Sequence, residues 1–100
     1  MTLSEAQKKY LRGLGHKLKP VIMIGESGLS DGVTLEFAGA ITHHELVKVS
    51  VRVGDRDERD RIIEKLCSDH SASLVQRVGN MALVYRENPE KKKRIRLPNK

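Results

Sequence analysis

Apolar residues recur at helical intervals near the start of the chain. Ser4 and Gln7 have the spacing of a capping box, and apolar residues then return every three or four positions as far as Leu14. This pattern predicts a short amphipathic helix over residues 4–14, and Gly15 is expected to end it.

Two later stretches have the same periodicity. A run from Leu29 to Ile41 keeps helical spacing, with Ser30 or Asp31 as its N-cap. Residues 54–70 begin with a turn and continue as a third helix, with alternating charges on its outer face. The residues expected on its inner face are Ile62, Ile63, Leu66 and Cys67.

Two glycines stand inside the predicted second helix. Gly32 and Gly39 each cost a helix about 1 kcal/mol relative to Ala, so packing rather than propensity must hold this one. We therefore expect another element to approach closely at both positions.

Strand patterns occupy the segments between the helices. The apolar run at residues 21–24 is continuous, which favours a strand buried on both faces. Residues 45–53 alternate instead, so the valines of this strand should face the core. Its other face, with Lys48 and Arg52, is expected to be largely solvated.

The end of the chain supplies two more strands and a tail. Residues 73–78 and 81–86 flank a Gly-Asn pair at 79–80, which suits a two-residue hairpin turn. Residues 88–100 have little to bury, so we expect a basic flexible tail, mobile or loosely docked, on a single domain of residues 1–87.

The predicted order of elements is α-β-α-β-α-β-β, which defines an α/β fold with a mixed four-stranded sheet. Because a helix joins the first two strands, these strands are expected to be parallel with a right-handed crossover. The final hairpin then supplies the antiparallel edge.

Positive charge is concentrated at the two ends of the chain. Residues 1–20 hold five Lys or Arg and one Glu, and residues 87–100 hold six Lys or Arg and two Glu. With a net charge of +6 and a pI near 9.7, this distribution is typical of a nucleic-acid-binding protein. A shared basic surface requires the two ends to lie near each other. Its expected members are Lys8, Lys9, Arg12, His16, Lys17, Lys19, Lys91, Lys92, Lys93 and Arg94.

The segment Gly25-Glu26-Ser27-Gly28 lies between a predicted strand and a predicted helix. Its glycines permit a sharp turn and a close ligand approach, and the N–H groups of the following helix turn favour an anion. It lacks the Lys-Ser/Thr pair of a triphosphate-binding loop and the third glycine of a dinucleotide fingerprint. The nearest analogue is the GXXG loop of KH domains, which clamps an RNA backbone, although a plain strand-to-helix turn fits the spacing equally well.

Three separated segments carry a family resemblance. LRGLGHKLKPVIMIGESGLSDGV, HHELVKV and LVYR before a basic end resemble the CRM domain, most closely its stand-alone bacterial YhbY-like members, over nearly the whole chain. The resemblance implies an RNA-binding domain of CRM/KH-like type, similar in fold to the C-terminal domain of a bacterial translation initiation factor. It also implies association with precursors of the large ribosomal subunit.

The same resemblance assigns the site. The RNA-contacting loop of the family falls on residues 25–28, with Lys17 and Lys19 before the strand as companions. Many CRM domains carry a basic residue inside this loop, whereas this chain has Glu26. A clamp here must therefore use backbone N–H groups, Ser27 and the surrounding Lys and Arg.

Other polar residues have weaker assignments. His43 and His44 have no third ligand nearby, so we expect no metal site and expect them to end the second helix, one packed and one exposed. Lys48, Arg52 and Arg86 are either solvated residues of the sheet or a second RNA contact. Only three aromatic residues occur, too few for a base-stacking platform, so recognition should depend on backbone and shape.

The functional prediction is an RNA-binding assembly factor for the large ribosomal subunit that is not an enzyme. The chain lacks a grouped carboxylate pair, a metal-ligand set and a nucleophile beside a base, so no catalysis, cofactor or small-molecule substrate is expected. It has no apolar signal core and no run of about 20 apolar residues, so we expect a cytoplasmic monomer without membrane contact. The alternative is a protein-interaction module that contacts ribosomal proteins rather than RNA.

Overall fold

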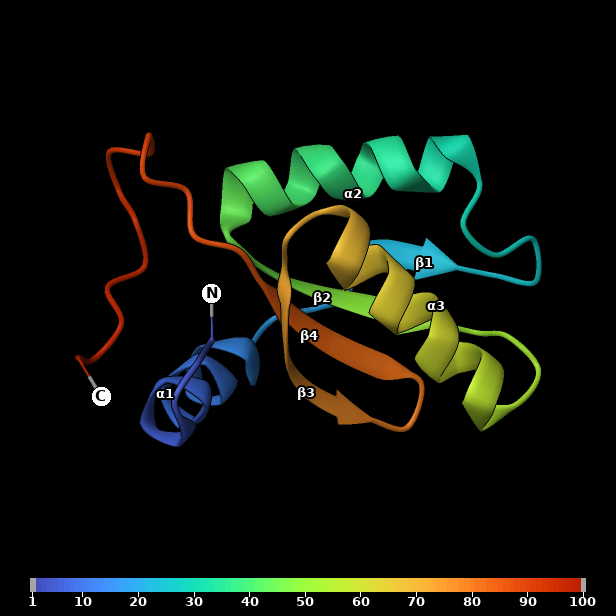
Figure 1. Cartoon of the computed structure of the whole chain (residues 1–100), viewed down its shortest axis with the longest axis horizontal. Coiled ribbons are helices and arrows are strands. Elements are labelled where there is room, and N and C mark those ends of the chain that lie inside the picture. The colour runs from blue at the N-terminus through green and yellow to red at the C-terminus, as the bar shows by residue number, and fades with distance from the viewer. Residues whose placement is uncertain (1, 100) are drawn as a thin grey trace.

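The structure, a computed structural model, describes residues 2–99, and within them it has three helices and a four-stranded sheet (Figure 1). The elements in chain order are α1 (Glu5–Gly15), β1 (Ile22–Ile24), α2 (Asp31–His44), β2 (Leu46–Val51), α3 (Arg56–Asp69), β3 (Ser73–Val78) and β4 (Met81–Tyr85). The predicted order α-β-α-β-α-β-β is confirmed.

Side-chain caps determine where the first two helices begin. Ser4 Oγ accepts a hydrogen bond from Gln7 N at 3.1 Å, and Gln7 Oε1 accepts one from Ser4 N at 3.0 Å, which confirms the predicted capping box of α1. At α2 the N-cap is Ser30, whose Oγ accepts from Val33 N at 3.2 Å. Of the two predicted caps for this helix, Ser30 is therefore the correct one.

The strands form one sheet in the order β1-β2-β4-β3. β1 runs parallel to β2, whereas β4 is antiparallel to both β2 and β3. The mixed sheet, the parallel pair joined through α2 and the terminal hairpin all agree with the sequence prediction. In the hairpin turn Gly79 has a φ of 59°, a left-handed conformation that favours glycine.

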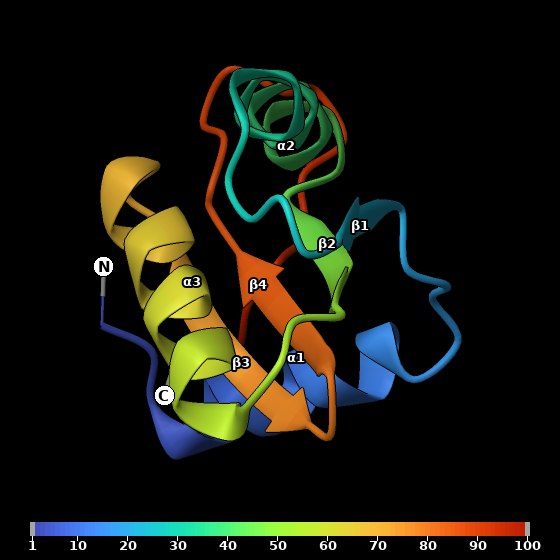
Figure 2. The same ribbon diagram turned by 90° about the vertical axis from the view of Figure 1, so that its right-hand side faces the viewer.

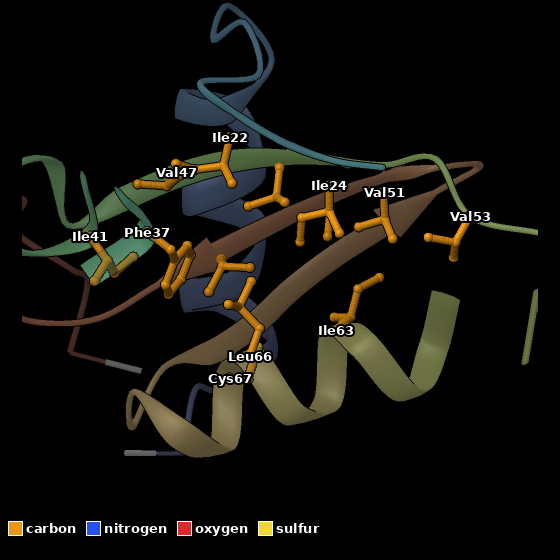
Figure 3. Close-up of a cluster of buried hydrophobic side chains, with 13 residues drawn as sticks. Ile22, Ile24, Phe37, Ile41, Val47, Val51, Val53, Ile63, Leu66 and Cys67 are labelled. Atoms are coloured by element: carbon orange, nitrogen blue, oxygen red, sulfur yellow. The ribbon is translucent and has the colours of Figure 1, made fainter. Parts of the chain in front are cut away.

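Helices cover the two faces of the sheet unequally. α2 and α3 lie on one face, and α1 crosses the other (Figures 1 and 2). On the α2 and α3 side, side chains of both helices and of the strands point toward one another in a single apolar cluster (Figure 3). Its fully buried members include Ile22, Ile24, Phe37, Ile41, Val47 and Leu66.

The second face of β2 is not largely solvated, so that prediction is wrong. Leu46 and Ser50 on this face are both buried. The amphipathic helix α1 covers part of this face, because a second apolar cluster joins Leu3 and Leu11 to Leu46 of β2 and Leu83 of β4. The alternating pattern showed which residues share a face, but it could not show which element would cover that face.

β1 is an edge strand and is not buried on both faces, which corrects a second prediction. Ile22 and Ile24 are buried, whereas Met23 between them is 51% exposed and Val21 is 50% exposed. The physical reason is the sheet order: β1 has one neighbouring strand, and α1 packs against β2 and β3 instead.

Another element approaches the helices closely at Gly15, and not at Gly32 or Gly39. A side chain at Gly15 would place its Cβ 2.5 Å from Leu83 Cδ2, so the Leu83 side chain would have to shift if this position were not glycine. At Gly32 the nearest atom would be 4.0 Å from a Cβ, and Gly39 has open space there. The prediction for those two positions is therefore wrong.

Glu45, the residue between α2 and β2, seats the chain end on the domain. Its side chain is buried, and its two carboxylate oxygens accept hydrogen bonds from Asn88 N at 2.9 Å and Ile95 N at 2.8 Å. Lys91 Nζ lies 3.9 Å from the same carboxylate. A buried carboxylate is costly unless it is paired and hydrogen-bonded, so Glu45 and the tail depend on each other.

The tail also brings the two basic ends of the chain together, as a shared surface requires. Ile95 and Leu97 pack against the α1-side cluster, and Gln7 Nε2 donates a hydrogen bond to Pro98 O at 2.9 Å. These contacts agree with the docked alternative of the sequence prediction. The division into a domain of residues 1–87 and a flexible tail of 88–100 stays a prediction, and its outermost residues, 1 and 100, lie outside the described part.

Candidate nucleic-acid interface

Residues 25–28 form a tight turn between β1 and α2. Gly28 N donates a hydrogen bond to Gly25 O at 2.9 Å, and the φ of 67° at Gly28 is one that glycine adopts without strain. Ser30 N then donates to Gly28 O at 3.0 Å, and Ser30 caps α2. The turn thus leads directly into a helix N-terminus, where N–H groups and the helix dipole favour an anion.

The loop carries negative charge of its own, and Arg52 flanks it. Glu26 is exposed, and Asp31 lies in the first turn of α2. Arg52 N donates a hydrogen bond to Ile24 O at 2.7 Å, so this arginine sits beside the end of β1 where the loop begins. Its side chain is exposed, with Nε 3.4 Å from Ser50 Oγ. Arg52 is therefore the cation that the sheet brings to the loop.

Lys17 and Lys19 lie before β1, as the family pattern implied, and the loop follows this short strand. Both lysines are exposed, and their part in RNA binding stays a prediction. Lys19 lines a hollow of about 180 Å³ together with Lys48 and His44.

A larger hollow brings together three of the predicted cations. Arg12 and His16 stand at the C-terminal end of α1, and Lys48 comes from β2. They line a hollow of about 400 Å³ on the α1 side of the sheet, which we call the α1 hollow. The rest of its lining is Gly15, Gln76, Val78, Met81, Ala82 and Leu83. Sequence reasoning named the three cations but missed the hollow, because its walls come from four separate elements.

The tail cations form a separate group. Lys91 is paired with Glu45, and Arg94 Nη1 lies 3.8 Å from Glu87 Oε1. In Figure 1 the tail lies at the opposite end of the sheet from the loop that joins β1 to α2. The structure therefore does not join the tail cations to that loop. The basic residues that line a hollow of about 390 Å³ on the tail are Lys91, Lys92, Lys93, Arg94 and Arg96.

Two of the remaining predicted contacts have partners within the protein. Arg86 donates from Nη1 to His70 O at 3.1 Å and from Nη2 to Thr42 Oγ1 at 2.6 Å, so its guanidinium ties β4 to the ends of α2 and α3. Lys8 makes a 3.9 Å ion pair within α1, and Lys9 beside it is exposed. Arg86 thus has a structural role within the fold. Of the two neighbouring lysines, Lys9 is more accessible to a ligand than Lys8.

The aromatic and thiol side chains are mostly buried. Phe37 lies in the core, as predicted. Tyr85 is buried on the α1 side, where burial and the Glu45 carboxylate raise its pKa to about 12. Burial raises the pKa of the Cys67 thiol to about 11, so the nucleophilic thiolate is disfavoured. Among the phenylalanine and tyrosine rings of the described residues only Tyr10 is exposed, which is too little for a stacking platform.

The paired histidines end α2 as predicted, but both His43 and His44 are exposed, so the expectation that one is packed is wrong. Their rings meet edge to face with centroids 4.6 Å apart. Within residues 2–99, His, Cys, Asp and Glu do not gather in a group of three or more that could hold a metal ion. No helix in that range has both the length and the apolar character needed to cross a membrane.

These features define a class of protein. It is a small basic α/β domain in which a glycine-bounded loop joins an edge strand to a helix, and cations line the more open side of the sheet. The chain belongs to the CRS1/YhbY (CRM) domain family, whose sequence model matches residues 3–86. The resemblance carried by the three sequence segments is thereby confirmed.

Relatives in three bacteria agree with this assignment. A Pseudomonas aeruginosa protein named as a probable RNA-binding protein is 43% identical over 95 residues, which cover 95% of this chain and 91% of the relative. A Haemophilus influenzae protein named as an RNA-binding protein is 43% identical over 99 residues, 99% of this chain and 98% of the relative. The solution structure of a hypothetical protein from Staphylococcus aureus is 33% identical with a TM-score of 0.83, over 97% of this chain and 100% of that one. The predicted fold is therefore confirmed.

Proposed function

We propose that this chain binds structured RNA in precursors of the large ribosomal subunit and acts in their assembly without catalysing a reaction. The observation that carries the proposal is a cationic band on the α1 side of the sheet, made of Arg52, Lys48 and Arg12, with the imidazole of His16 beside them. Lys48 lines the α1 hollow with Arg12 and His16, and Arg52 flanks the glycine-bounded loop. Relatives that are named as RNA-binding proteins support this reading.

The geometry of β2 explains why the band is continuous. Alternate residues of a strand face the same side of the sheet and lie about 7 Å apart. Ser50 stands between Lys48 and Arg52 in this alternation, and its Oγ lies 3.4 Å from Arg52 Nε. The two cations therefore point to the same side, where they can contact successive phosphates of one backbone. Such contacts fix position and orientation rather than base sequence.

The glycine-bounded loop seats the RNA backbone at one end of this band. Gly25 has open space where a side chain would lie, so a phosphate can approach the main chain there. Ser27 is exposed and offers a hydroxyl. The carboxylate of Glu26 opposes a phosphate, and the adjacent Arg52 offsets that charge. The loop thus orients the backbone, and the cationic band supplies most of the attraction.

The salt dependence of binding tests the RNA contact. With about four phosphates neutralised, raising the salt from about 50 to about 200 mM should weaken binding to a structured fragment of large-subunit ribosomal RNA about a hundredfold, because bound cations release counterions. Filter binding or fluorescence anisotropy measures the dissociation constant at each salt concentration. A change of less than about threefold would contradict a phosphate interface.

Association with ribosome precursors tests the biological part of the proposal. A tagged chain expressed in the cytoplasm, where we expect it to act as a monomer, should co-sediment with precursors of the large subunit in sucrose gradients. Charge reversal at Arg12, Lys48 and Arg52 to Glu should abolish this association, because it reverses the cationic band. If the folded reversed variant still co-sediments, the contact is with ribosomal proteins rather than with RNA.

A further inference from the structure

The α1 hollow combines an apolar floor with a cationic rim. Met81 and Leu83 of β4 and Val78 of β3 form the floor, while the end of α1 and Lys48 form the rim. Val78, the last residue of the edge strand β3, is 63% exposed and adds apolar surface that a ligand in the hollow can cover. The described residues that line the hollow include no Asp or Glu, so nothing in the lining opposes an anion.

Gly15 holds one wall of the hollow close to its floor. A Cβ at this position would lie 2.5 Å from Leu83 Cδ2, so the absence of a side chain at Gly15 lets the end of α1 pack closely on Leu83. The same end of α1 carries Arg12 and His16, which line the hollow together with Met81 and Leu83. The rim cations are therefore placed by packed secondary structure rather than by a loose loop.

The side chain of Gln76 adds hydrogen-bonding capacity to the same hollow. It lies on β3 directly opposite Leu83 in the sheet register, and it is exposed. A carboxamide presents both a donor and an acceptor group, as the edge of a nucleobase does. The hollow thus offers an apolar surface, a neutral polar edge and a cluster of cations within about 400 Å³, a volume within the range of small-ligand sites.

We propose that the α1 hollow accepts one unpaired nucleotide of the bound RNA. The base lies on Met81 and Val78 with its edge toward Gln76, and the flanking phosphates face Arg12 and Lys48. This inference rests on the proposed RNA-binding function and adds a base-binding subsite to it. It supplies base contacts without an aromatic platform, since an extruded base can also stack against apolar side chains. A bulged or looped-out nucleotide in an otherwise paired RNA is the fitting ligand class.

A set of matched RNA stems tests the proposal. The stems are fully paired, or carry one bulged nucleotide with each of the four bases in turn, or carry an abasic nucleotide in the same bulge. The wild-type chain should bind at least one base-containing bulge about tenfold more tightly than the abasic bulge. The abasic stem retains the bulge and every phosphate, so this ratio reports the base alone.

Two methionines provide a matched pair of variants. Met23 and Met81 both stand opposite Ser50 in the sheet register, on either side of β2, and only Met81 lines the α1 hollow. Met81→Ser should bring the ratio of base-containing to abasic affinity close to one while leaving affinity for the paired stem unchanged. Met23→Ser should keep the ratio. Gln76→Ala, at an exposed position, gives a second hollow variant that does not depend on Met81→Ser remaining folded.

The outcomes separate this inference from the function on which it rests. If the wild-type chain binds none of the stems, the proposed RNA-binding function fails. If it binds them but shows no base preference, or if the folded Met81→Ser and Gln76→Ala variants both retain the preference, only the base-binding subsite is overturned. Titration of the Met81 methyl signal compares the affinity of the hollow for free nucleoside monophosphate with its affinity for the bulged stem. If the two dissociation constants are equal, the ligand is a free nucleotide and the RNA assignment is wrong.

Discussion

The two faces of the sheet differ in what they bury and in how far they are covered. On the α2 and α3 side, Val47, Val49 and Val51 point into one apolar cluster, and each is at most 1% exposed. On the α1 side, the alternate residues of the same stretch include Lys48 and Arg52, and a single helix covers part of the surface. One strand thus contributes to a closed core and, through the partly exposed Lys48 and the exposed Arg52 just after its end, to a partly covered cationic surface.

This difference separates stability from binding. The closed face is sealed by two helices, so a substitution there changes packing and acts on the free energy of unfolding. The open face keeps cations and the α1 hollow accessible, so a substitution there should act mainly on affinity for an anionic partner. Paired substitutions on the two faces test whether stability and RNA affinity depend on different faces of the sheet.

Phe37→Ala on the closed face should have the largest effect. Phe37 is fully buried, so the free energy of unfolding should fall by about 3–5 kcal/mol through lost contacts and a cavity. Leu35→Ala on the same helix is the control: Leu35 is 75% exposed, and the change should be within about 0.5 kcal/mol. Urea denaturation measures both. A loss below about 1 kcal/mol for Phe37→Ala would mean that the closed face does not dominate stability.

Glu45→Gln tests whether the docked tail is part of the covering on the α1 side. The glutamine keeps one acceptor oxygen but turns an amide donor toward a backbone N–H and loses the charge facing Lys91, so we expect a loss of about 1–3 kcal/mol. Hydrogen exchange at Ile95 N should become faster. Glu87→Gln, at an exposed pair with Arg94, should change stability by less than about 0.5 kcal/mol. Equal effects of the two variants would show that the tail is not anchored through Glu45.

Lys48→Glu on the open face should weaken RNA binding about tenfold at fixed salt, because it removes a phosphate contact and adds a repulsive charge. The melting temperature should change little. Lys65→Glu makes the same charge change on the outer side of α3, where the Lys65 side chain is 66% exposed, and it should have a much smaller effect. Anisotropy titrations compare the two, and equal losses would mean that net charge, rather than the cationic band, governs binding.

The difference in RNA affinity between Gly28→Asp and Gly28→Asn should be the smallest of these effects. It reports the contribution of the glycine-bounded loop alone. Both variants meet the same backbone strain at φ 67°, so their melting temperatures should agree within a few degrees. They differ only in charge, and the aspartate should bind RNA about threefold more weakly than the asparagine if a phosphate lies against the loop. Equal affinities of the two folded variants would reduce residues 25–28 to a structural turn.

The sequence by itself determined most of the secondary structure and its order. The capping box of Ser4 and Gln7, the Gly-Asn hairpin at 79–80 and the alternating valines of β2 act over a few residues, and all appear as predicted. The parallel pairing of β1 with β2 also followed, because a helix that joins two neighbouring strands leaves little choice of direction. Local backbone and side-chain preferences are sufficient for all of these features.

The site could be predicted only as separate residues. Arg12, His16 and Lys48 were each named as RNA contacts, and the structure brings them to one hollow, while Lys19 lines a second hollow that also includes Lys48. No spacing along the chain signals these distances, because they depend on how far α1 reaches across the sheet.

Only the tertiary structure decided which element covers which surface. It placed β1 at the sheet edge, laid α1 over the polar face of β2, and buried Glu45 under the tail. Periodicity shows that residues share a face, but burial of that face depends on packing with elements distant in sequence. Here that packing is fixed by contacts such as Gly15 against Leu83, between residues 68 positions apart whose proximity neither local pattern reveals.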